Sequence, residues 1–72
     1  MTTQPQLQKL LKTAQTCVKK GEYSNALRVL TEARASFPDS HELFFNIAVA
    51  NRLAGNLGDA IQALDEALAL EP

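Results

Sequence analysis

The sequence predicts an all-α fold, an α-solenoid of two tandem helix-turn-helix hairpins with four helices, on the strength of two observations. The first is a repeat in which residues recur with the same identity 34 positions later: Gly21 and Gly55, Ala26 and Ala60, Leu30 and Leu64, Ala33 and Ala67, Pro38 and Pro72. The second is that apolar residues recur three and four positions apart between these points, which is the spacing of one helix face. A fixed period of this length is typical of stacked repeats, in which each unit buries its apolar face against its neighbour.

The first helix is predicted to begin near Pro5, because Thr3 and Gln6 have the spacing of a capping box and proline is tolerated in a first helical turn. It should end by Gly21, because glycine readily adopts the left-handed conformation that follows many helices. The apolar face of this helix consists of Leu7, Leu10, Leu11, Ala14, Cys17 and Val18.

The second helix should start at a Ser24 cap and end before Pro38, which completes the first hairpin. Its apolar residues are Ala26, Leu27, Val29, Leu30 and Ala33. The third helix is opened either by Asp39 together with Glu42 or by Ser40, and Gly55 ends it. The residues expected to face inward are Leu43, Phe44, Ile47, Ala48 and Leu53.

The fourth helix should begin near Gly58 and end before Pro72. It presents Ala60, Ile61, Leu64, Ala67 and Leu68 as its apolar face. Residues 1–72 therefore form a single domain, with repeat one at about 5–38 and repeat two at about 39–72. Because the chain stops on the last residue of the repeated motif, we expect it to be a fragment of a longer protein.

These units resemble the tetratricopeptide repeat, which is 34 residues long and follows the pattern W-x₂-L-G-x₂-Y, then A-x₃-F, then P. The first unit contains Leu10-x₂-Thr13-Ala14-x₂-Cys17, then Ala26-x₃-Leu30 and Pro38; the second contains Phe44-x₂-Ile47-Ala48-x₂-Asn51, then Ala60-x₃-Leu64 and Pro72. Thr13, Cys17 and Asn51 depart from the pattern and predict thinner packing at the turn end of both first helices. Cys17 is expected to be a small buried apolar residue rather than a reactive thiol.

The resemblance implies a protein-interaction module or scaffold that binds a peptide or a partner domain on a concave face lined by the first helix of each repeat. The residues it assigns to this face are Leu11, Lys12, Gln15, Lys19, Phe45, Asn46, Val49 and Arg52. Cations beside apolar side chains suit an extended or helical peptide that bears acidic groups. In the alternative interpretation, the apolar members of this set pack against neighbouring helices.

A second candidate surface lies on the last helix, where Leu68 and Leu70 replace the Arg34 and Ser36 of the first unit. Together with Leu64 they form an apolar end that further repeats, another domain or a second copy of the chain should cover. The alternative function is therefore an N-terminal accessory or oligomerisation segment of a larger protein, which could be an enzyme.

The charges nearly cancel, with a formal net charge of −1, and this argues against an obligatory nucleic-acid partner. They are distributed unevenly. The charged residues before Gly21 are all basic, namely Lys9, Lys12, Lys19 and Lys20, and the charged residues after Gly55 are all acidic. Either these are solvated helix faces, or they promote head-to-tail attraction or form a basic docking strip. No apolar run reaches the roughly 18 residues that a membrane-spanning helix needs.

The sequence offers no catalytic constellation, so we expect no enzymatic activity, no metal site and no cofactor. His41 is the single histidine, and the spacing of the glycines matches no phosphate-binding loop. Cys17 has no second cysteine to pair with, and the first residues lack the features of a signal peptide. A cytoplasmic location is the resulting expectation.

Overall fold

The computed structural model describes residues 5–70 of the 72-residue chain, and these residues form helices and turns without any strand. The helices are α1 (Pro5–Lys19), α2 (Tyr23–Ser36), α3 (His41–Leu53) and α4 (Leu57–Leu70). The predicted all-α fold of two helical hairpins is therefore confirmed. The Thr3 part of the predicted capping box lies outside the described residues.

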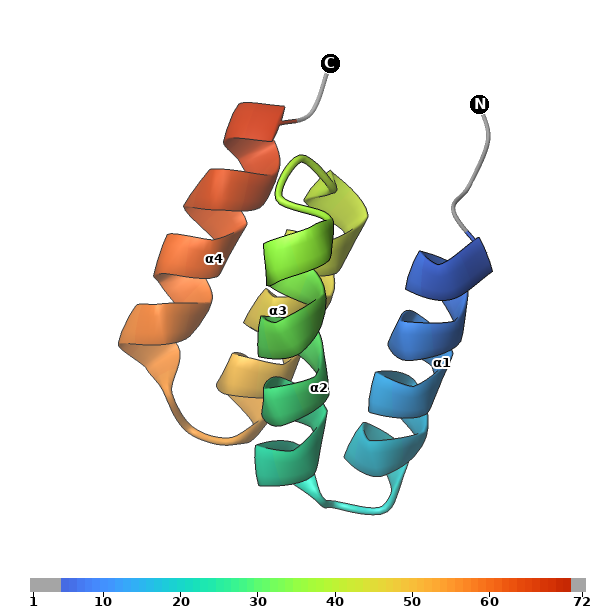
Figure 1. The fold of residues 1–72 in the computed structure, drawn as a ribbon. Helices are drawn as coiled ribbons and strands as arrows, with labels where there is room; N and C mark the ends of the chain where they lie inside the picture. Colours follow the sequence, from blue (N-terminus) through green and yellow to red (C-terminus); the bar gives the residue numbers. More distant parts are fainter. Residues whose placement is uncertain (1–4, 71–72) are drawn as a thin grey trace.

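α1 and α4 lie at opposite edges of the molecule, and α2 lies in front of α3 between them (Figure 1). The turns that close the two hairpins lie at one end of the molecule, and the connection between α2 and α3 lies at the other (Figure 1). α3 packs against both α2 and α4, whereas α1 contacts mainly α2 and touches α3 only slightly. The contact between α2 and α3 is thus the main joint between the hairpins.

Both hairpin turns have the same hydrogen-bond pattern. After α1, the Glu22 N–H donates to the Cys17 carbonyl at 2.8 Å and the Gly21 N–H donates to the Val18 carbonyl at 2.9 Å. After α3, Asn56 donates to Asn51 at 2.8 Å and Gly55 donates to Arg52 at 3.1 Å in the same arrangement. This is the Schellman motif, which needs a residue with positive φ, and Gly21 (φ 79°) and Gly55 (φ 89°) supply it.

Replacing Gly55 with alanine is expected to lower the free energy of unfolding by about 1–2 kcal/mol, the usual cost of a left-handed backbone for a residue with a Cβ. An added Cβ would meet nothing within 4 Å, so the cost is purely conformational. Gly58 is the matched control, because it lies inside α4 without positive φ and with equally open space around it. Gly58→Ala should raise the unfolding free energy by up to about 1 kcal/mol. Urea titrations followed by circular dichroism should therefore show changes of opposite sign.

The start of α2 differs from the sequence-based expectation. The Ser24 cap is wrong, because α2 begins at Tyr23 and its N-cap is Glu22, whose side chain makes no capping hydrogen bond. The Glu22 N–H is already used to close α1, so the chain passes directly from the turn into the next helix. Of the two alternatives predicted for the start of α3, Ser40 is the N-cap. Its hydroxyl accepts a hydrogen bond from the Leu43 N–H at 3.1 Å.

The core contains most of the residues that the apolar spacing placed inward, drawn from all four helices. Its members are Leu7, Leu11, Ala14, Ala26, Leu30, Ala33, Leu43, Phe44, Ile47, Ala48, Ala50, Ala63 and Ala67. Four residues expected inward are exposed instead: Leu53, Ile61, Leu64 and Leu68. They are exposed because no helix within the described residues packs on the far side of α3 and α4. Cys17 is half-buried against the core rather than fully buried.

Asn51, which departs from the repeat pattern, is the one buried polar residue of the described chain and is only 7% exposed. Its amide donates to the Ile47 carbonyl at 3.1 Å, and its side-chain oxygen accepts from Asn56 Nδ2 at 3.3 Å. Buried polar groups are costly unless they are hydrogen-bonded. The two asparagines therefore meet this requirement and tie the end of α3 to the turn that leads into α4.

Candidate partner-binding face

The polar side chains of α1 and α3 meet along one side of the molecule. Gln8 Nε2 lies 3.5 Å from Glu42 Oε1, and these two residues hold the same position in successive repeats. Further along, Gln15 Nε2 lies 3.4 Å from Asn46 Oδ1, while Asn46 Nδ2 donates to the Glu42 carbonyl at 2.8 Å. These exposed contacts connect the α1 and α3 surfaces, and the bond to the Glu42 carbonyl orients the Asn46 amide.

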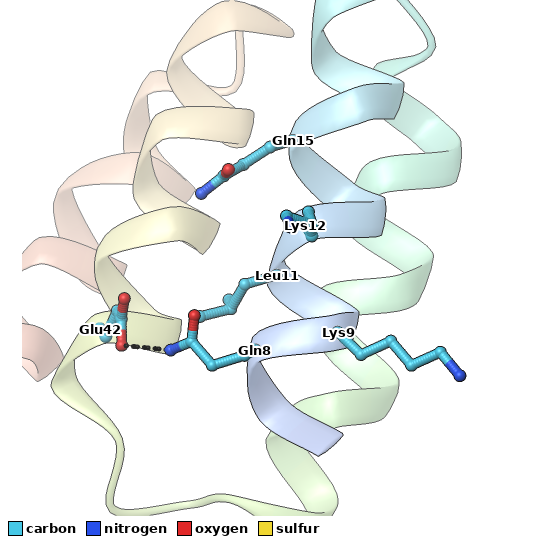
Figure 2. A pocket seen from close by; sticks show the side chains of 6 residues that line it. All are labelled: Gln8, Lys9, Leu11, Lys12, Gln15 and Glu42. Carbon is cyan, nitrogen blue, oxygen red and sulfur yellow. Dashed lines mark hydrogen bonds between the residues drawn. The ribbon is translucent and has the colours of Figure 1, made fainter. Parts of the chain in front are cut away.

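A polar hollow of about 310 Å³ lies at the start of this side. Its lining residues are Gln8, Lys9, Leu11, Lys12, Gln15 and Glu42. Figure 2 shows Gln8 reaching across to Glu42, whereas Lys9 extends away from α3. Leu11 belongs to the floor, since it is only 2% exposed. The groups open to a ligand here are therefore amides, a carboxylate and the ammonium group of Lys12.

A second hollow, of about 220 Å³, continues along the same side between α1 and α3. It is lined by Ala14, Gln15, Val18, Lys19, Leu30, Asn46 and Val49. Its walls are mostly apolar, and the polar groups of Gln15, Lys19 and Asn46 border them. Such a site suits one apolar side chain whose neighbouring backbone is within reach of hydrogen-bonding groups.

A third hollow, of about 150 Å³, lies between α3 and α4. Phe45, Ala48, Val49, Arg52, Ala60 and Leu64 line it. Val49 lines both this hollow and the preceding one, so the two are adjacent on the α3 surface. Phe45 is 54% exposed and is the large aromatic side chain most available to a partner on this side.

The structure divides the predicted concave-face residues among these hollows. Lys12, Gln15, Lys19, Asn46 and Val49 lie where α1 and α3 meet, whereas Phe45 and Arg52 lie in the hollow between α3 and α4. The expectation of an exposed Leu11 is wrong, because α3 follows α1 and leaves Leu11 in the core, as the alternative interpretation had it.

Sequence reasoning missed that Leu64, assigned to the other surface, shares a hollow with Phe45 and Arg52. The repeat itself carried the signal. Ala14 and Leu30 line the second hollow, and the residues one repeat later, Ala48 and Leu64, line the third. Of the predicted end surface, Leu64 and Leu68 are exposed, while Leu70 is half-buried and packs against the core.

Other kinds of site were sought in the part of the chain that the structure describes. Among residues 5–70, no three His, Cys, Asp or Glu side chains lie close enough together to hold a metal ion. The described helices are all too short or too polar to cross a membrane.

Comparison with known proteins gives one match. A family model described as tetratricopeptide repeat matches residues 11–72, which is most of the chain. No curated protein and no solved structure shows significant similarity to the chain. The repeat period, the helix pairs closed by glycine turns and this match agree, and the chain belongs to the tetratricopeptide repeat family.

Proposed function

We propose that the chain binds a peptide segment of a partner protein along the concave face formed by α1 and α3. Tetratricopeptide repeats generally mediate protein–protein interactions and typically act as non-catalytic scaffolds. The observation that carries the proposal is the row of three hollows, which runs from Lys12 past Val49 to Phe45 and Arg52. A row of small hollows on paired helices fits an extended chain better than one compact ligand.

The side chains along this face define the chemistry of the partner. Lys12 and Lys19 border the hollows beside α1, and Arg52 borders the hollow beside α4, while Val49 lies between them. The segment should therefore place apolar side chains over Val49 and Phe45 and carry acidic groups near its ends. We further propose a cytoplasmic location, where an unpaired cysteine such as Cys17 stays reduced.

The test starts from peptides selected from a random display library on the immobilised chain, with affinities then measured by fluorescence polarisation. Phe45→Ala and Arg52→Ala should each weaken binding of the selected acidic peptides about thirtyfold, the effect of losing an interface hot spot. Leu53→Ala and Lys20→Ala are matched controls, because both residues are exposed and line none of the three hollows. If the selected peptides bind all four variants equally well, the concave-face assignment is wrong.

A separate observation favours oligomerisation as a second function. α4 exposes the large apolar side chains of Leu57, Ile61 and Leu68, which lie outside the face between α1 and α3.

A further inference from the structure

Equivalent positions of the two repeats differ sharply in exposure. Leu11 and Leu30 are 2% and 1% exposed, whereas the residues one repeat later, Phe45 and Leu64, are 54% and 39% exposed. Glu42 of α3 lines a hollow together with Leu11, and Val49 of α3 lines one together with Leu30, so the second hairpin lies beside these positions of the first. Nothing within the described residues covers the same positions of the second hairpin.

The uncovered surface continues along α4 as a stripe on one helix face, because its residues are spaced four, three and four positions apart. The stripe consists of Leu57, Ile61, Leu64 and Leu68, all of them exposed. We propose that a second copy of the chain covers this surface. The first hairpin of the second copy would pack on the second hairpin of the first copy, in the way that the two hairpins pack within one chain. The residues that we expect the second copy to cover are Phe45, Ile61, Leu64 and Leu68.

Two contacts between the hairpins give matched pairs when they are moved one repeat along the chain, whereas the Arg34–Glu66 ion pair becomes Leu68 beside Glu32. Within the chain, Gln8 donates to Glu42; one repeat later, Glu42 meets Gln8 of the second copy, and the same hydrogen bond can form. Within the chain, Arg34 lies over the Phe44 ring at 5.3 Å; one repeat later, Leu68 meets Leu10 of the second copy. Both new pairs are chemically matched.

The joint between α2 and the second hairpin extends in the same way. Leu27, Thr31 and Arg34 of α2 line a hollow together with Ile47 of α3 and Gln62 of α4. One repeat later, α4 contributes Ile61, Asp65 and Leu68, while the second copy contributes Thr13 and Arg28. Asp65 thereby shares a hollow with Arg28, which joins opposite charges, and Ile61 lies against Thr13.

Charge selects this arrangement over a pairing of two α4 helices. α1 carries Lys9, Lys12 and Lys19 without an acidic residue, and α4 carries Asp59, Asp65 and Glu66 without a basic one. Two α4 helices would bring carboxylates of like charge together, whereas α1 beside α4 brings opposite charges together. Because α1 and α4 lie at opposite edges of the molecule, the contact joins unlike surfaces (Figure 1). Such contacts produce open chains or rings rather than closed pairs.

The experiment is sedimentation equilibrium of the 72-residue chain over a range of concentrations at low salt. We expect the average mass to rise with concentration and to pass beyond two copies. Ile61→Glu should weaken association about tenfold to a hundredfold, because it removes one large aliphatic side chain from the contact. Ile61 is 61% exposed in the single chain, so this variant should keep its helicity by circular dichroism.

Ala69→Glu is the matched control. It adds the same charge to the same helix, but at an exposed position whose counterpart in the first repeat, Ala35, also stays exposed although α3 packs on α2. The control should associate like the unmodified chain. A monomeric unmodified chain, or equal behaviour of the two variants, would overturn the proposal, and the first result would point to another protein or a further repeat as the cover.

A mixing experiment tests the direction of the contact. Thr13→Glu blocks the α1 side and lies at an exposed position, and Ile61→Glu blocks the α4 side. Each variant alone should associate about tenfold to a hundredfold more weakly than the unmodified chain, while an equimolar mixture should form pairs that grow no further, since each pair has one intact joint. Self-association of the Thr13→Glu chain, without recruitment of the Ile61→Glu chain, would mean that α4 pairs with α4 and would refute the head-to-tail arrangement. The proposed second copy would cover Phe45 and Leu64 of the third hollow, so it competes with a peptide for that part of the face. Both mass experiments are done without peptide, so their outcome and that of the peptide test can be told apart.

Discussion

Leu30→Ala is expected to lower the free energy of unfolding by about 2–5 kcal/mol, the largest loss that we predict for a single substitution. Leu30 is one of the two largest fully buried side chains, and it contributes to the joint between the two hairpins. Truncating a buried leucine costs about 2–5 kcal/mol, which includes the cavity left behind. A domain of this length has a total stability of only about 4–10 kcal/mol at the usual stability per residue. The substitution therefore removes about half of the stability or more.

Leu64→Ala is the control that isolates burial from chemistry. It deletes the same atoms at the same position of the repeat, but Leu64 is 39% exposed, so we expect a loss of about 1 kcal/mol. Urea titration followed by circular dichroism at low protein concentration measures both losses, since low concentration keeps the chain monomeric. Equal losses of unfolding free energy at the two positions would contradict the difference in burial between Leu30 and Leu64.

The second large effect is expected from enlarging a small core residue. Ala26 has no exposed surface, and it lies near the start of α2, just after the turn from α1. Protein interiors are close-packed, and adding methylene groups to such a site costs typically about 1–3 kcal/mol. Ala26→Leu should therefore lower the midpoint of thermal unfolding markedly, and it should also spread the first hairpin.

Ala35→Leu provides the comparison on the same helix. Ala35 is exposed, and leucine is nearly as good a helix former as alanine, so the unfolding midpoint should hardly change. Thermal unfolding followed by circular dichroism gives both values. A small shift for Ala26→Leu, similar to that of Ala35→Leu, would mean that the first hairpin can adjust to a larger side chain and that the close approach of its helices is not fixed.

The repeat in the sequence predicted the hairpins well, because the glycines and the apolar spacing act locally. Gly21 and Gly55 end their helices by a hydrogen-bond pattern that depends on only a few consecutive residues. The cap of α2 was predicted wrongly for a related reason. Ser24 is a good capping residue by type, but the bond that closes α1 uses the Glu22 N–H and starts α2 before Ser24 is reached.

Exposure was harder to predict, because it depends on which helix lies alongside. Leu11 and Phe45 hold the same position in successive repeats, yet Leu11 is buried and Phe45 is half exposed. The difference arises because α3, the first helix of the next repeat, lies beside Leu11, whereas no such helix lies beside Phe45 within the described residues. The periodicity of a single helix gives the direction of each side chain around that helix and says nothing about its neighbours. For the same reason the sequence separated Phe45 and Leu64 into two surfaces that share one hollow.

The order in which the helices depend on one another bears on how the protein is made. α1 lies at an edge and contacts mainly α2, whereas α3 packs on both of its neighbours. A ribosome delivers α1 and α2 first, and at that moment Leu30 lacks the cover that α3 later provides. The nascent first hairpin should therefore remain open to proteases until α3 has left the exit tunnel. Folding during synthesis should then finish late, when the second hairpin packs on the first.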